Sequence, residues 1–393
     1  MLDIELYRMS ESLARQAVRT WRYAQVHRLD AFEKAGFPVR IGNLGELDQI
    51  VGSMHANDRY AVLQDELAGF DDTDLERFVS ALADFYDFHV STFRRTEVTV
   101  PLAEMIAHLA VYKMVAAYNP GFRSLLEIGP GNGLLAFLLR GHDGLRDYTQ
   151  IEACESFYLP QSLIDSHLFG PAFDEWARPR GLDAAADCFV GDGAVAVQQL
   201  TRKPELNPAL PLQVDAVAHH CPWWRIAEVA AQRRYDIVTS NANLLEFTPE
   251  ALNDYVALMR KVVADDGILY VQCFGGRVNG QVSDAVERLY AAGFRALLLV
   301  PDGGMLSDDE RGRHKRLALG NGVFVTPAHP DYDKASAQPR ANHASDCAAI
   351  QRMCFAEAGD ARRHYEAGEI LDLLAAEIAR RHGGVKGNAR SAA

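Results

Sequence analysis

Hydrophobic residues recur every three or four positions through the first 120 residues, which is the spacing of one face of a helix. Thr73 with Glu76 three residues later predicts a capping box, and Pro101 suits the first turn of a helix. No alternation typical of a strand interrupts this region, so residues 1–120 are predicted to form a helical lid or accessory domain. The predicted helices cover Leu6–Leu29, Leu75–Phe88 and Leu102–Val115.

From residue 123 onwards, short apolar runs alternate with helical segments. Repeated strand–helix units with strands that are apolar on both faces favour a mostly parallel, doubly wound sheet. The predicted strands are Arg123–Ile128, Tyr148–Ile151, Val214–Ala218, Tyr235–Thr239 and Ile268–Phe274. Helices are predicted from about Leu134 and over Pro160–Leu168, Trp224–Gln232, Pro249–Val263 and Val282–Ala291.

The end of this run has a different pattern. Phe294–Val300 and Leu317–Val325 are strand candidates with no strong helix between them, so they could pair as an antiparallel edge. Ala328–Asn342 is rich in turn-forming residues, and residues 347–382 return to a helical pattern. The expected division is a helical region over 1–120, an α/β domain over 121–327, and a linker with C-terminal helices over 328–393.

Composition and charge narrow the class of function. The 393 residues carry a net charge of −13, and no large cationic field is available to displace counterions from a phosphate backbone, so nucleic acid is not an expected partner. The longest apolar runs fall well short of the roughly eighteen residues of a membrane span. The six cysteines form no CxxC pair, which predicts no metal site and a reduced, cytoplasmic setting. A small-molecule substrate and a monomer or homodimer are expected.

A glycine loop, LLEIGPGNG over residues 125–133, lies between a predicted strand and a predicted helix. Glycines there allow a sharp turn and a close approach of the backbone to a ligand. The dinucleotide fingerprint is GxGxxG, whereas this loop is GxGxG and has Leu134 at the place of the third dinucleotide glycine. Acidic residues end this strand at Glu127 and the next strand at Glu152.

Over roughly residues 120–326 this combination resembles the class I S-adenosylmethionine-dependent methyltransferase superfamily. There, an acid precedes GxGxG, as Glu127 does here, and the acid that ends the next strand holds the ribose hydroxyls, the position of Glu152. A carboxylate can accept both diol hydrogens. The resemblance implies a Rossmann-like sheet and S-adenosylmethionine as cofactor. The residues it implies for binding are Glu127, Gly129, Gly131, Asn132, Gly133, Glu152, Asp192 and Asn241.

Alternatives stay open for the reaction that the protein catalyses and for the role of Asp192. The N-terminal helical region, EIGPGNG and IEACESFYLPQ are similar to the sugar O-methyltransferase group. The wider superfamily also includes enzymes that cyclise S-adenosylmethionine to azetidine-2-carboxylate, and the fold alone does not separate the two reactions. Asp192 resembles the acid that contacts adenine, but it could equally lie in a surface turn, because Val214–Ala218 competes to be the third strand.

Polar residues at the ends of later strands are the candidates for catalysis, because open α/β sheets bind ligands there. His219 and His220 follow Val214–Ala218, and since neighbours in a strand face opposite sides, only one could enter a site as general base. A histidine with satisfied hydrogen bonds is the alternative for each. Asn241 and Asn243 follow the fourth strand, where an amide could orient an acceptor or bind the cofactor amine.

Other side chains near these positions have both a functional and a structural interpretation. Trp223 and Trp224 could stack on adenine or pack a helix against the sheet. Arg94 or Arg95 could pair with the cofactor carboxylate or lie in solvent, and Glu246 could be a base or a helix-terminal charge.

The leading hypothesis is methyl transfer to a small-molecule oxygen or nitrogen. The alternatives are intramolecular cyclisation with release of methylthioadenosine and, from another class, a non-catalytic protein that binds S-adenosylmethionine. A nicotinamide-dependent oxidoreductase is disfavoured by Leu134, which breaks the dinucleotide fingerprint.

Overall fold

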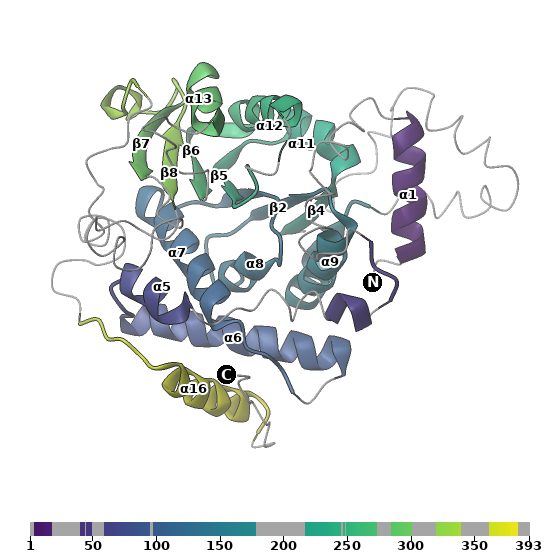
Figure 1. Cartoon of the computed structure of the whole chain (residues 1–393), viewed down its shortest axis with the longest axis vertical. Helices are drawn as coiled ribbons and strands as arrows, with labels where there is room; N and C mark the ends of the chain where they lie inside the picture. The colour runs from purple at the N-terminus through teal and green to yellow at the C-terminus, as the bar shows by residue number, and fades with distance from the viewer. Residues whose placement is uncertain are drawn as a thin grey trace, which may run out of the picture.

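An eight-stranded sheet forms the centre of the part of the chain that the structure, a computed structural model, describes (Figure 1). The described residues are 4–17, 40–43, 45–48, 59–94, 97–177, 217–244, 247, 249–272, 284–300, 320–338 and 361–383. The strands are β1 (Ser124–Ile128), β2 (Asp147–Glu152), β3 (Phe173–Glu175), β4 (Ala218–Pro222), β5 (Tyr235–Asn241), β6 (Val263–Gln272), β7 (Arg295–Val300) and β8 (Asn321–Val325). Their spatial order is β3-β4-β2-β1-β5-β6-β8-β7.

The strands from β3 to β6 pair in parallel, whereas both pairs formed by β8 are antiparallel. β1 lies between β2 and β5, so the strand order reverses there, as in doubly wound folds. β8 pairs antiparallel with β6 on one side and with β7 on the other. The predicted Rossmann-like α/β fold and the antiparallel pairing of the last two strands are therefore confirmed.

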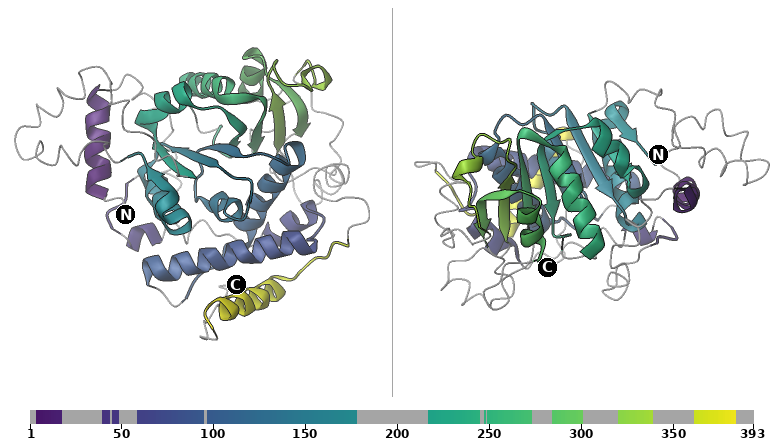
Figure 2. Two further views of the ribbon diagram at one scale, coloured as in Figure 1. Left: turned by 180° about the vertical axis from the view of Figure 1, so that it is seen from behind. Right: turned by 90° about the horizontal axis from the view of Figure 1, so that it is seen from above.

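Helices cover both faces of the sheet (Figures 1 and 2). Successive strand residues enter opposite cores: Leu125 of β1 packs with the helices of one face and Leu126 with those of the other. Burial on both faces explains why the strands are continuous apolar runs in the sequence. One face carries α7 (Leu102–Tyr118), α8 (Leu134–Leu139) and α9 (Glu155–Phe169), and the other carries α11 (Ile226–Gln232), α12 (Pro249–Val262) and α13 (Asp284–Ala291).

The N-terminal and C-terminal helices add layers to the α7–α9 face. α6 (Asp72–Phe93) packs against α8 and α9, α5 (Tyr60–Glu66) against α7, and α16 (Ala367–Arg381) against α6. α1 (Ile4–Ala17) stands apart from these layers and contacts the 3₁₀ turn after β4, Trp223–Arg225 (Figure 1). In the described part of the chain, no helix has both the length and the apolar character needed to cross a bilayer.

One local prediction, the capping box at Thr73, is wrong. Asp71 is the N-cap of α6, and its carboxylate accepts the backbone N–H of Asp74 at 2.7 Å. Thr73 therefore lies inside the first turn and cannot form the expected capping box with Glu76, since a capping residue must precede the helix. Of the strand expected at Val214–Ala218, residues 214–216 lie outside the described residues, and β4 covers Ala218–Pro222.

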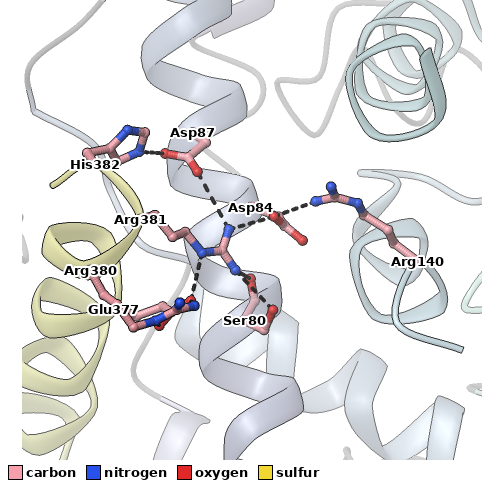
Figure 3. A network of polar contacts seen from close by, with 8 residues as sticks. All are labelled: Ser80, Asp84, Asp87, Arg140, Glu377, Arg380, Arg381 and His382. Atoms are coloured by element: carbon pink, nitrogen blue, oxygen red, sulfur yellow. Dashed lines mark hydrogen bonds and ion pairs between the residues drawn. The ribbon is translucent and has the colours of Figure 1, made fainter.

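A buried carboxylate joins α6, α8 and α16 (Figure 3). Asp84 Oδ1 of α6 accepts from Arg381 of α16 at 2.7 Å and from Arg140, the C-cap of α8, at 2.6 Å. Arg381 also donates to Glu377 at 2.7 Å and to Ser80 Oγ at 3.0 Å. A cavity of about 1250 Å³ opens between these three helices, and the charged side chains drawn in Figure 3 pair with one another at its wall.

Removing the shared carboxylate should weaken the attachment of α16. We expect Asp84→Ala to lower the free energy of unfolding by about 1–3 kcal/mol, because Arg140 and Arg381 then lose the buried acceptor that they share. The matched control is Arg380→Ala, since that side chain is 73% exposed and pairs with Glu377 of its own helix. The control should leave the free energy of unfolding nearly unchanged, because an exposed ion pair contributes little. Urea denaturation measures both, and equal losses would contradict the role given to Asp84.

Candidate functional site

The glycine loop turns at the carboxyl end of β1, where the strand order reverses. Gly129, Gly131 and Gly133 have φ of 66°, 58° and 71°, values that favour glycine. A Cβ atom on Gly129 would lie 2.0 Å from Nδ2 of Asn243, whereas one on Gly131 would meet nothing within 4 Å. Gly129 is therefore required by packing, and Gly131 presents bare backbone to open space that a ligand can enter. Asn132 Oδ1 accepts the N–H of Leu134 at 3.3 Å and so supports the start of α8.

Glu152 lies beside this loop, at the carboxyl end of β2, and is 5% exposed. Its Oε1 accepts the backbone N–H groups of Ala153 and Cys154 at 2.7 and 2.9 Å. Its Oε2 accepts from Nε2 of Gln161 at 3.2 Å. Burial raises the pKa of Glu152, while these donors act in the opposite direction. The carboxylate is thus held in one orientation at the strand end.

Gln161 of α9 is a site residue that the sequence analysis missed. Besides Glu152, its Nε2 donates to the carbonyl of Gly131 at 2.6 Å, and its Oε1 lies 3.0 Å from His220 Nε2. The available signal was the run of polar residues at helical spacing on a helix that also had to pack against the sheet. Those polar, buried positions are Gln161, Ser162 and Asp165.

The two histidines lie within β4 and not after it. His219 and His220 pair with β2 three and two residues before the level of Glu152, so they lie below the strand ends. They face opposite sides of the sheet, as expected for neighbours. The His219 ring, 3% exposed, lies between Arg233 Nη2 at 3.3 Å and Asp174 Oδ2 at 3.5 Å.

His220 is fully buried under α9. Its ring stacks on Tyr158 with centroids 3.7 Å apart, and Nδ1 lies 3.6 Å from Oε2 of Glu175. Although burial acts to raise it, the pKa of Glu175 is held below its usual value by the hydrogen bond and charge of His220. With Gln161 on its other ring nitrogen, His220 is enclosed by protein groups on both sides.

The two asparagines after β5 have different positions. Asn243 is buried, and its amide donates to the carbonyl of Ile128, which holds the start of the glycine loop. Asn241 is the last residue of β5, and its Oδ1 accepts from Thr239 at 3.1 Å. Its amide also lies close enough to Glu127 to favour the charged form of that carboxyl group. Asn241 is the member of the pair at the strand ends.

Glu127 lies in a buried polar layer beneath the loop. It is 1% exposed, and Tyr148 Oη donates to its Oε2 at 2.6 Å. Burial raises the pKa of Glu127 from 4.5 to about 7. Gln150 continues the layer by donating to Tyr148 at 2.6 Å and to Asp165 at 3.4 Å, and burial raises the pKa of Asp165 well above its usual value.

Tyr7 of α1 was also missed, and it closes the β4 side of the site. Its ring is fully buried against Tyr158 and Trp224, with centroids 4.8 and 5.3 Å away. Burial and the nearby charges of Glu11 and Glu152 raise its pKa. Among the described residues its hydroxyl has no hydrogen-bond partner. Tyr7 therefore brings an unused donor close to Glu152.

Glu155, the first residue of α9, attaches the N-terminal segments to the site. Its carboxylate accepts from Arg8 Nη2 at 2.6 Å, from Arg40 Nη1 at 2.5 Å and from the N–H of Ile41 at 3.1 Å. These bonds hold the pKa of Glu155 below its usual value even though burial opposes them. Its partners lie 114–147 residues away in the chain, so no local pattern could have indicated them.

Some of the predicted residues lie elsewhere. Asp192, Arg95 and Glu246 are outside the described residues. Arg94 is the exposed C-cap of α6. Trp223 follows the end of β4, but its ring is fully buried and its Nε1 donates to Glu11. Where the structure describes the chain, no three metal-ligating side chains come together.

Comparisons with known proteins show similarity only in fold. No family model and no curated protein matches the chain. A TehB-like SAM-dependent methyltransferase from Corynebacterium glutamicum is 11% identical over 55% of this chain and 87% of that chain, with a TM-score of 0.32. The N-methyltransferase NodS from Bradyrhizobium japonicum, in complex with S-adenosylhomocysteine, is 14% identical over 56% and 86%, with a TM-score of 0.33. Spermidine synthase from Thermotoga maritima is 11% identical over 73% and 77%, with a TM-score of 0.33.

The narrower resemblance to the sugar O-methyltransferase group is not confirmed by these three proteins.

Two glycine substitutions should separate packing from ligand access. Gly131→Ala should keep the fold and cost about 1–2 kcal/mol, the strain of a positive φ. Gly129→Ala should cost more, roughly 3 kcal/mol or above, because its Cβ would overlap the Asn243 amide. Thermal melts followed by circular dichroism measure the difference. Equal destabilisation of the two variants would show that Gly131 does not face open space.

The raised pKa of Glu127 should make stability depend on pH. Because the folded protein binds this proton more tightly than the unfolded chain, the stabilisation is complete below pH 4.5 and is lost as the pH rises to about 7. Glu127→Gln removes this titration, so between about pH 5 and about pH 8 its melting temperature should fall less than that of the wild type. The control, Glu76→Gln on the exposed side of α6, should follow the wild type. A parallel pH dependence in Glu127→Gln and wild type would refute the assignment.

Proposed function

We propose that this chain binds S-adenosylmethionine at the carboxyl ends of β1, β2 and β5 and transfers its methyl group to a small-molecule oxygen or nitrogen. The observation that carries the proposal is the pairing of Gly131 and Glu152 at adjacent strand ends. Bare backbone at Gly131 lets a ligand approach closely, and the oriented Glu152 carboxylate can accept from a ribose diol. The two lie where the strand order reverses, the usual place for a ligand in an open α/β sheet.

The residues at the strand ends fit the parts of this cofactor. Glu152 would hold the ribose, the glycine loop would take the methionyl end, and Asn241 would bind its amine. Tyr7 brings a buried hydroxyl without a partner among the described residues, so it can donate to a ligand beside Glu152. The carboxylate of Glu152 and the open space beside Gly131 also suit a cationic sulfonium. Asp192 remains proposed for adenine on the resemblance alone.

The protein's part in this reaction is alignment and the exclusion of water. When bound, the cofactor supplies an activated methyl group, so the barrier is lowered mainly by holding donor and acceptor together. α1 suits the exclusion of water because Tyr7 is fully buried and Glu155 ties Arg8 and Arg40 down beside it. Asn241, at the end of β5, is placed to orient an acceptor.

The histidines are better suited to support than to proton transfer. His219 is enclosed by Arg233 and Asp174, and His220 by Gln161 and Glu175, so neither ring presents a free nitrogen at the strand ends. An amine acceptor needs no strong base, and the proposal includes no histidine base. The cytoplasmic setting and the monomeric or homodimeric state stay predictions from the sequence. Cys154 and Cys221 are both buried.

The proposal is tested by cofactor binding and by product analysis. S-adenosylmethionine should raise the melting temperature and NAD should not. Glu152→Gln should weaken binding roughly 10- to 100-fold, the effect of losing a charge-assisted hydrogen bond, while Glu76→Gln should leave it unchanged. Mass spectrometry should then detect S-adenosylhomocysteine with hydroxylated or amine acceptors.

Three results would contradict the proposal. Protection by NAD would indicate an oxidoreductase. Methylthioadenosine formed without any acceptor would indicate cyclisation. Tight binding of S-adenosylmethionine with no turnover across an acceptor screen would indicate a binding protein.

A further inference from the structure

α9 presents polar side chains to the sheet, and Gln161 is at the centre of them. Gln161 is fully buried, and its neighbours on this face, Ser162 and Asp165, are buried too. A helix that packs on a sheet ordinarily buries an apolar stripe, and burying an amide is unfavourable unless all its hydrogen bonds are made. Gln161 makes three, and each goes to a different element of the site.

Two of these bonds join parts of the site that are separate in the chain. Nε2 donates to the Gly131 carbonyl at 2.6 Å and to Glu152 Oε2 at 3.2 Å, so one amide nitrogen sets the spacing of loop and carboxylate. The third glycine of the loop makes this approach possible: a Cβ on Gly133 would lie 3.3 Å from Gln161 Cγ. Glycine at that position allows α9 to lie close beneath the loop.

The third bond sets the direction of the amide. If the amide were turned over, Oε1 would face two acceptors, the Gly131 carbonyl and Glu152, and both bonds would be lost. His220 prevents this by placing Nε2 3.0 Å from Oε1, where its N–H can donate. Glu175 Oε2 lies 3.6 Å from the other ring nitrogen and so helps to hold the ring in this orientation.

We propose that Gln161 is the positioning residue that holds Glu152 and the glycine loop at the spacing S-adenosylmethionine requires, and that His220 with Glu175 fixes the direction of its amide. This inference rests on the proposed function. It gives His220 a role other than that of a general base, since His220 acts through Gln161 and does not touch the ligand. Gln161 also helps keep Glu152 charged, because its donated hydrogen bond lowers the pKa that burial raises.

The test is calorimetric binding of S-adenosylhomocysteine, the product of the proposed reaction. Gln161→Met keeps the length of the side chain and removes both donors, and it should weaken binding roughly 10- to 50-fold. The matched control is Gln64→Met, because Gln64 of α5 is a buried glutamine that bonds the backbone of Tyr365, far from the loop in the sequence. The control should lose stability and keep the wild-type Kd.

Two further readouts distinguish positioning from general support of the fold. The double variant Gln161→Met with Glu152→Gln should bind less weakly than the product of the two single effects predicts, because both remove the same carboxylate interaction. As the pH is lowered, the affinity of Gln161→Met for S-adenosylhomocysteine should begin to fall at a higher pH than the affinity of the wild type, because Glu152 becomes protonated sooner. The titratable groups that interact with Glu152 in the described part of the chain are Tyr7 of α1, Glu127 of β1, Cys154 before α9 and His220 of β4.

The outcomes separate this inference from the proposed function. No binding to the wild type would overturn the proposed function and this inference with it. Binding to the wild type with an unchanged Kd in Gln161→Met, or strictly additive effects in the double variant, would overturn the inference alone. If Gln161→Met does not fold, Gln161→Asn serves instead, since it keeps the amide but is too short to reach both acceptors, and it should bind at least about 10-fold more weakly.

Discussion

Carboxyl groups buried between α9 and the sheet impose the constraint on which the site depends. Asp165 of α9 and Glu127, Glu152 and Glu175 of the strands are the members of this group, and a carboxylate removed from water is tolerated only when hydrogen bonds compensate it. Gln161 supplies part of that compensation for Glu152. The same bonds align the glycine loop with β2, so the need to satisfy buried polar groups also determines the geometry presented to a ligand.

The segments outside the sheet are attached by a related device. At three places one buried carboxylate accepts from two basic side chains that come from distant parts of the chain. Asp74 binds Lys113 and Arg362, while Asp84 binds Arg140 and Arg381 and Glu155 binds Arg8 and Arg40. Shared carboxylates hold both long side chains in one geometry, which an isolated surface pair does not achieve. The N-terminal helix, the C-terminal helix and the central fold are joined mainly by such pairs together with apolar packing.

Residues that are close together in the sequence have different partners in this site. Asn241 and Asn243 are two residues apart, yet one ends a strand and the other turns back to hold the loop. His219 and His220 are adjacent, yet they face different layers of the molecule. In both pairs the residue type indicates only a capacity to donate or accept a hydrogen bond. The backbone direction decides which partner forms that bond. Residue type alone therefore overestimates the number of groups that can meet a ligand.

The amino-acid sequence by itself determined the sheet, the positions of most strands and the glycine loop. Those features depend on local quantities: the period of apolar residues and the φ values open to Gly129 and Gly131. Only the tertiary structure decided that Gln161 and Tyr7 belong to the site, and that His220 lies below the strand ends. Their partners are 9 to 217 residues away along the chain. Hydrogen bonds and ring contacts at such separations follow from how the layers pack, and no local pattern in the sequence records that packing.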